Sequence, residues 1–133
     1  MKSVKCRISE VSLKTNDTLL INIESDHEFN ASDFNELKLA AAKIGEGKKF
    51  YNIINVGEYT LPDKEARELS CSRLGSIYKK ADAFVIKSLP QKIVGNLMLK
   101  INLPVVPTKF FTKIEEAEEW INCLRKKEIK VLV

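Results

Sequence analysis

Few side chains in this 133-residue sequence could carry out chemistry, and they lie far apart. His27 is the only histidine, and the cysteines Cys6, Cys71 and Cys123 form no CxxC pair. A nucleophile–base pair or a metal site needs several such groups at close spacing. The sequence therefore predicts no catalytic residues, no metal site and no cofactor, and it favours a protein that is not an enzyme.

Four polar side chains are candidates for binding a ligand or partner: Arg73, Ser88, Asn96 and Thr60. Arg73, with Ser70, falls within the predicted core-facing arc of a helix, where it can reach an anionic ligand or a carboxylate such as Asp82. Ser88 begins a predicted helix, so its hydroxyl can hold an anion or cap the helix. Asn96 can line a pocket or bond a neighbouring loop. For each of them the structural role is the commoner one.

Charge along the chain limits the partners. The 22 Lys and Arg against 18 Asp and Glu give a net charge of +4, and part of the excess lies in residues 125–130. A nucleic-acid domain usually carries a denser basic face with interleaved aromatic residues, so nucleic acid is not a favoured partner. His27, between Asp26 and Glu28, is a candidate proton switch or an ordinary solvated loop residue.

The sequence predicts a cytoplasmic protein. No apolar stretch follows the N-terminus as in a signal peptide, and no apolar run is long enough to span a membrane. The odd, dispersed cysteines indicate reduced thiols. A hydrophobic content of 44% is sufficient for one globular domain over residues 1–133.

The first half of the sequence predicts a hairpin followed by a helix and a strand. Apolar and polar residues alternate over residues 4–13, and a second strand covers residues 19–24 after the turn Asn16-Asp17. A helix should begin after Asn30, a capping residue, and end at Gly45. Residues 50–56 form an apolar strand of the kind that helices cover on both faces.

The second half alternates helices with strands. Helices are predicted over residues 60–80, 88–101 and 112–124, and strands over residues 81–86 and 105–111. Pro104 and Pro107 place the last strand at a sheet edge. Trp120 should lie partly against the sheet. The order ββαβαβαβα indicates an α/β fold with one mixed sheet, antiparallel in its N-terminal hairpin and parallel in its later strands.

The core of this single domain is expected to cover residues 4–124. The tail 125–133 is first basic and then apolar. Because residues 125–127 interrupt the apolar stripe of the last helix, we expect folding to survive removal of the tail. Residues 131–133 are apolar enough to add an edge strand or to dock on a second copy of the chain.

The element order and several segments of the second half resemble the STAS-like, or SpoIIAA-like, fold of anti-sigma-factor antagonists, and in particular a group of small bacterial proteins of that type. The segments are residues 81–88, 95–96, 102–104, 107–112 and 116–121. The first half shares only the order of its elements. The resemblance implies a domain that acts by binding a partner.

In regulatory members of this fold, a Ser or Thr beside an Asp lies between the central strand and the next helix. A partner kinase phosphorylates it, which breaks a complex. The corresponding stretch here is residues 55–63, where Asn55 replaces the expected Asp and Thr60 is the only aliphatic hydroxyl. We therefore expect Thr60 to cap the second helix near Asp63 and not to act as a phosphorylation switch.

We interpret the chain as a non-enzymatic STAS-like interaction or regulatory module. Its partner would be an unidentified protein or a second copy in a homodimer, and a small apolar or anionic ligand is compatible with it. The alternative is a carrier of a small apolar or lipid-like ligand, as in the related CRAL-TRIO architecture. A closed apolar cavity of roughly a few hundred cubic ångström favours the carrier, whereas a filled core with an exposed apolar patch favours the interaction module.

Overall fold

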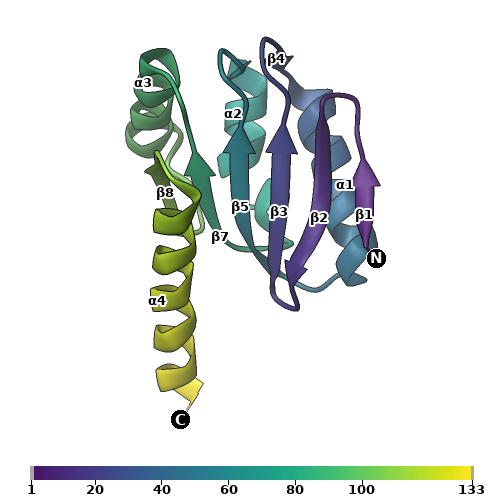
Figure 1. Ribbon diagram of the computed structural model, residues 1–133, viewed down its shortest axis with the longest axis vertical. Coiled ribbons are helices and arrows are strands. Elements are labelled where there is room, and N and C mark those ends of the chain that lie inside the picture. The colour runs from purple at the N-terminus through teal and green to yellow at the C-terminus, as the bar shows by residue number, and fades with distance from the viewer. Residues whose placement is uncertain (1, 133) are drawn as a thin grey trace.

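The computed structural model describes residues 2–132, which build a six-stranded mixed sheet (Figure 1). The strand order is β1-β2-β3-β5-β7-β8. β1 (Ser3–Lys5), β2 (Ser9–Thr15) and β3 (Thr18–Ile23) are antiparallel. β5 (Phe50–Val56), β7 (Lys79–Val85) and β8 (Thr108–Phe111) continue the sheet in parallel. The predicted mixed sheet, with its antiparallel start and an edge position for the last strand, is confirmed.

Helices cover both faces of this sheet. α1 (Ala31–Gly45) and α2 (Lys64–Cys71) lie on one face, and α4 (Ile114–Leu132) lies on the other (Figure 1). α3 (Leu89–Leu97) runs into a π-helical turn, η2 (Met98–Asn102), beside β8. Two short parallel strands, β4 (Glu28–Phe29) and β6 (Leu61–Pro62), join the loops beyond the sheet.

The side chains of β5 alternate between two separate hydrophobic cores. Phe50 and Ile54 belong to the core beneath α1, and Tyr51 and Ile53 belong to the core beneath α4. Alternate residues of a strand point to opposite faces, so a strand covered on both sides is apolar throughout. The interior of β5 departs from this rule at Asn52, which shares the face of Phe50 and Ile54.

The N-terminal hairpin contains one more strand than the sequence indicated. The chain turns at residues 6–8, where the Cys6 N–H donates to the Ser9 carbonyl oxygen at 2.8 Å, and this turn separates β1 from β2. Arg7 in the turn donates to both carboxylate oxygens of Asp33 at 2.8 and 2.7 Å. These hydrogen bonds hold the pKa of Asp33 below its ordinary value and tie the turn to the start of α1.

The second helix is shorter than predicted, which is a correction at both ends. Its cap is Asp63, whose carboxylate accepts from the Ala66 N–H at 2.8 Å, and it ends at Cys71 instead of near residue 80. The Ser72 hydroxyl donates to the Leu69 carbonyl oxygen at 2.7 Å and accepts from the Gly75 N–H at 3.0 Å. This turn leads into a short 3₁₀ helix, η1 (Leu74–Ser76).

The tail continues α4 as far as Leu132, so its described part is helical and not a strand. Val133 and the side chains of residues 131–132 lie outside the described residues. Trp120 is half-buried, with its ring centroid 5.7 Å from that of Phe111, as the prediction of partial burial requires. Arg125 donates to Asp17 at 2.7 and 2.9 Å. Truncation after Leu124 would remove this pair, so we now expect it to lower stability.

We predict that Asp17→Asn lowers the free energy of unfolding by about 1.5 kcal/mol at neutral pH, because a charge-assisted pair is lost. The hydrogen bond from Arg125 holds the folded-state pKa of Asp17 well below its usual range. The contribution is therefore fully present above the unfolded-state pKa of about 3.9 and is lost as the pH falls further. Urea unfolding of wild type and variant at several pH values measures it.

The control is Asp26→Asn, which neutralises an exposed carboxylate of the β3–β4 loop. Its stability should follow the wild type at every pH. A difference between wild type and Asp17→Asn that stays constant from pH 7 down to about pH 3 would contradict the linkage.

Candidate functional site

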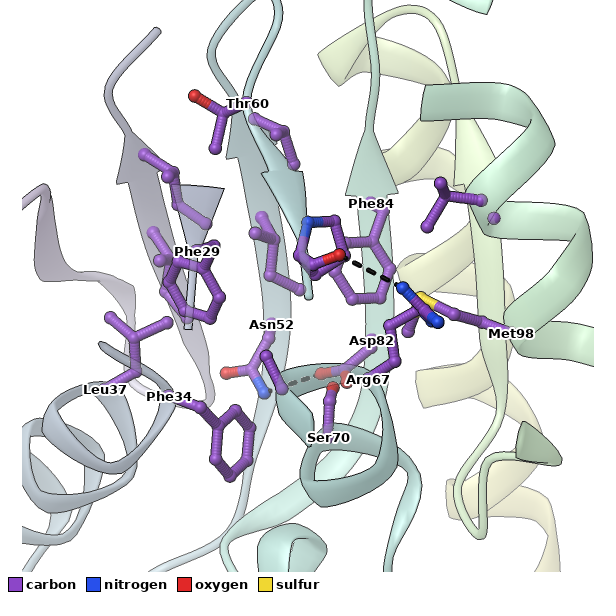
Figure 2. Close-up of a pocket in the computed structure, with 18 of the residues that line it drawn as sticks. Phe29, Phe34, Leu37, Asn52, Thr60, Arg67, Ser70, Asp82, Phe84 and Met98 are labelled. Atoms are coloured by element: carbon purple, nitrogen blue, oxygen red, sulfur yellow. Dashed lines mark hydrogen bonds between the residues drawn. The ribbon is translucent and has the colours of Figure 1, made fainter. Parts of the chain in front are cut away.

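A cavity of about 110 Å³ lies between α2 and the centre of the sheet (Figure 2). The central strands form its floor, α1 and the β4–β6 pair form one wall, and α3 with η2 closes the other side. Apolar side chains make up most of the lining, including Phe29, Phe34, Leu37, Phe84 and Met98. The core beneath α2 is therefore incompletely filled.

The floor of the cavity carries a buried polar cluster. Asn52 of β5 and Asp82 of β7 are direct neighbours in the parallel register, and Asn52 Nδ2 donates to Asp82 Oδ1 at 2.9 Å. Lys79 Nζ donates to the other oxygen, Asp82 Oδ2, at 2.7 Å and to the Ser70 carbonyl oxygen at 2.8 Å. Only 10% of the Lys79 side chain and 4% of the Asp82 side chain are exposed, so this is a buried ion pair.

The amide of Asn52 can adopt only one orientation. Both Asp82 oxygens of the ion pair are acceptors, so Asn52 must turn its NH₂ group toward Asp82. Its Oδ1 then points away from Asp82, toward the side of the cavity formed by Phe34 and Leu37 (Figure 2). Asn52 is only 6% exposed, and its buried Oδ1 has no hydrogen-bond partner. Such an unpaired acceptor is costly in a protein interior.

A second unpaired atom belongs to Arg67 of α2. Its Nη1 donates to the Pro62 carbonyl oxygen at 3.2 Å, whereas its buried Nε–H has no partner. Figure 2 shows the Arg67 side chain along the edge of the cavity, with its guanidinium near Met98. The cavity thus presents one free acceptor and one free cationic donor.

The structure separates the two residues that were expected to share a helix face. Ser70 lines the cavity, whereas Arg73 is exposed and is not among the residues that line it. The expected core-facing position of Arg73 is wrong, because α2 ends at Cys71 and helical periodicity no longer sets the direction of this side chain. The cation that pairs with the carboxylate of Asp82 is Lys79 and not Arg73. A sequence signal did exist for Asn52 and Asp82, since each stands between two apolar residues in the buried part of a strand.

Ser88 and Asn96 lie on α3, outside the polar cluster. Ser88 caps the helix and forms a reciprocal capping box with Gln91, as the structural interpretation of Ser88 requires. Asn96 is exposed on the outer surface of the helix. The preceding residue, Gly95, is buried and faces Phe110: a Cβ added at Gly95 would lie 2.9 Å from the Phe110 ring.

Thr60 is 1% exposed and is locked into the loop between β5 and α2. Its hydroxyl donates to the Glu24 carbonyl oxygen and accepts from the His27 N–H at 3.2 Å. Gln91 Nε2 donates to the Thr60 carbonyl oxygen at 3.0 Å. The expectation that Thr60 caps α2 is wrong, because Asp63 is the cap and Thr60 instead binds the β3–β4 loop.

A glycine makes this close approach of the two loops geometrically feasible. The Gly57 N–H donates to the Ile23 carbonyl oxygen at 2.8 Å, and a Cβ at Gly57 would lie 2.4 Å from the backbone nitrogen of Ser25. Lys87 adds a hydrogen bond to the Val56 carbonyl oxygen at 2.6 Å, and burial lowers the pKa of Lys87. The loop that resembles a phosphorylation site is thus tightly packed.

The remaining reactive groups are dispersed. Within residues 2–132, no three His, Cys, Asp or Glu side chains lie close enough to hold a metal ion. Cys6 and Cys71 are buried, and burial raises the pKa of both thiols, whereas Cys123 is exposed. His27 Nε2 lies 3.4 Å from Glu24 Oε1. In the same part of the chain, no helix is both long and apolar enough to span a bilayer.

Comparison with known proteins identifies a family and a fold. The sequence profile of the family described as a domain of unknown function, DUF7793, matches residues 11–125. The chain is similar to a crystal structure of an uncharacterised protein of the DUF3478 family from Shewanella loihica PV-4, described as having a SpoIIAA-like fold. That similarity has a TM-score of 0.59 at 14% identity and covers 84% of this chain and 90% of that one. No curated protein matches the sequence. The resemblance to the SpoIIAA-like fold is thereby confirmed.

We predict that Thr60→Ala lowers the free energy of unfolding by about 2 kcal/mol, because the His27 N–H and the Glu24 carbonyl lose a buried partner. Thr60→Ser retains the hydroxyl and should cost about 1 kcal/mol, mainly for the lost methyl group. Thermal and urea melts of the two variants measure the difference.

We further expect Thr60→Glu to destabilise the fold strongly, because it places a charge at a buried position. Folded wild-type protein should also resist phosphorylation at Thr60. A Thr60→Glu protein that melts like the wild type but no longer binds a partner would show that this loop is a phosphorylation switch after all.

Proposed function

The chain belongs to the DUF7793 family, and we propose that it is a non-enzymatic interaction module that binds a protein partner through the outer face of α3 and η2. The observation that supports this proposal is a row of exposed apolar side chains on α3. Leu89, Ile93 and Leu97 are 69%, 60% and 39% exposed. They follow one another at four-residue intervals, so they form a single ridge along the helix.

The apolar surface continues beyond this ridge into η2 and the segment that follows. Leu99, Ile101, Leu103 and Val105 are between 37% and 68% exposed. Isolated exposed apolar residues are common, whereas several on consecutive elements indicate an interaction surface. We define the α3–η2 surface as residues 89, 93, 97, 99, 101, 103 and 105.

The charge around the α3–η2 surface indicates the chemistry of the partner. α3 and η2 contain no Asp or Glu, and each carries one exposed lysine, Lys92 and Lys100. Interfaces commonly combine an apolar centre with a polar rim, and complementary charge directs the encounter. The matching partner is a protein with an apolar patch bordered by Asp and Glu.

The interior volume supports this proposal over a lipid carrier. A cavity of about 110 Å³ is well below the roughly 300–1,000 Å³ of ordinary ligand pockets. A lipid chain would have to displace α2 and expose the buried polar cluster beneath it. The apolar surface of α3, in contrast, is accessible without any rearrangement.

A photo-crosslinking amino acid at position 93 tests the proposal in cells. The control position is 39, because Leu39 is an equally exposed apolar residue of a helix, at 71%, but lies on α1. We expect position 93 to crosslink to one defined acidic protein and position 39 to give only background. With that protein purified, Ile93→Asp should weaken binding at least about tenfold, Leu39→Asp should not, and added salt should weaken it further.

Three outcomes would contradict the proposal. Equal background crosslinking from positions 93 and 39 would mean that the α3–η2 surface has no partner. Crosslinks between two copies of the chain would identify a homodimer, which light scattering would confirm. Crosslinks to lipid, together with binding to anionic vesicles, would identify a membrane surface as the binding partner.

A further inference from the structure

We propose that the cavity beneath α2 binds a small single-ring carboxylic acid that also carries a hydroxyl group. This inference concerns a site separate from the α3–η2 surface and does not depend on the function proposed for that surface. It rests on two unpaired polar atoms in the cavity, the charge of its lining and its size.

The hydroxyl is inferred from Asn52. This residue is more than nine-tenths buried, and Asp82 fixes its amide so that Oδ1 points into the cavity without a partner. An amide oxygen can only accept hydrogen bonds. A ligand that satisfies it must therefore donate, as a hydroxyl does.

The carboxylate is inferred from the charges of the lining. Lys38, Arg67 and Lys79 line the cavity against the single carboxylate of Asp82, and Lys79 already pairs with that carboxylate. The buried Nε–H of Arg67 has no partner. Arginine is suited to binding carboxylates, and a monoanion would compensate part of the positive excess.

The single ring is inferred from the volume and the walls. The volume of about 110 Å³ is below the roughly 150 Å³ of the cavity that accepts benzene, so it limits the ligand to one ring whose carboxylate lies at the cavity edge beside Arg67, and it is far below the volume that a lipid chain needs. Phe29, Phe34, Phe84 and Met98 supply aromatic and thioether surface around it. A flat apolar body with two polar ends fits this combination.

Calorimetric titration of the full chain with four probes tests the inference: 3-hydroxybenzoate, 4-hydroxybenzoate, benzoate and phenol. We expect at least one hydroxybenzoate to bind with a Kd below about 1 mM. Benzoate, which lacks the donor to Asn52, and phenol, which lacks the carboxylate for Arg67, should each bind about tenfold more weakly.

Variants assign each preference to its residue. Arg67→Met should abolish the advantage of hydroxybenzoate over phenol, whereas the control Lys64→Met, which removes an exposed cation from the same helix, should leave it unchanged. Asn52→Leu should abolish the advantage of hydroxybenzoate over benzoate. In Asn52→Ser the hydroxyl can donate to Asp82 while its oxygen can still accept from a ligand, so this variant should retain part of the advantage of hydroxybenzoate over benzoate. Circular dichroism verifies that each variant is folded.

The comparison of the four probes on wild-type protein is decisive even if a cavity variant does not fold. If no probe binds below about 10 mM, the unpaired atoms are satisfied by water and the proposal is wrong. Equal affinities for all four probes, or preferences that survive in full in Arg67→Met and in Asn52→Leu, would overturn it as well.

Discussion

The parallel register of β5 and β7 determines the chemistry of the interior, because it places Asn52 directly opposite Asp82. A carboxylate in this position must be paired, and Lys79 pairs with it from the first residue of the same strand. The same ammonium group donates to the Ser70 carbonyl oxygen near the C-terminal end of α2. One lysine therefore neutralises the floor of the cavity and anchors the helix above it, at the end where a cation is favoured.

This arrangement explains why α2 lies over a cavity and not on a filled core. The helix is held by its cap at Asp63 and by the contact of Lys79 with Ser70, while polar side chains occupy the sheet beneath it. A fully apolar floor would allow closer packing. The cavity is thus a consequence of burying Asn52 and Asp82, and so is the free amide oxygen of Asn52.

The fold could be predicted from the sequence to the extent that local patterns determine it. Strand alternation, the capping residues Asn30 and Ser88, and the edge prolines indicated the order of elements and the mixed sheet. Prediction was wrong where one polar contact ends an element. Apolar periodicity in the sequence extends the predicted second helix past Cys71, whereas in the structure the hydroxyl of Ser72 bonds the Leu69 carbonyl oxygen and the chain turns there. The position of Arg73 was wrong for the same reason.

The candidate site was harder to predict from the sequence, because its residues come together only through the pairing of strands and the packing of α2 on the sheet. Asn52, Arg67 and Lys79 lie on two strands and a helix, and no local spacing links them. Two polar residues inside buried strands were the one signal available. The α3–η2 surface was equally hard to predict. In the sequence its apolar residues look like the core-facing stripe of a helix, and only the structure shows which side of α3 faces β8.

The central claim is that Lys79 and Asp82 act as one buried unit on which the docking of α2 depends. A double-mutant cycle in urea, monitored by the fluorescence of Trp120, tests it most directly. We expect Lys79→Met to cost about 3 kcal/mol, because it leaves Asp82 buried without its counter-charge. The double variant Lys79→Met/Asp82→Asn should cost clearly less than the sum of the two single variants. Strictly additive costs would show that the two residues do not stabilise each other, and would contradict the account.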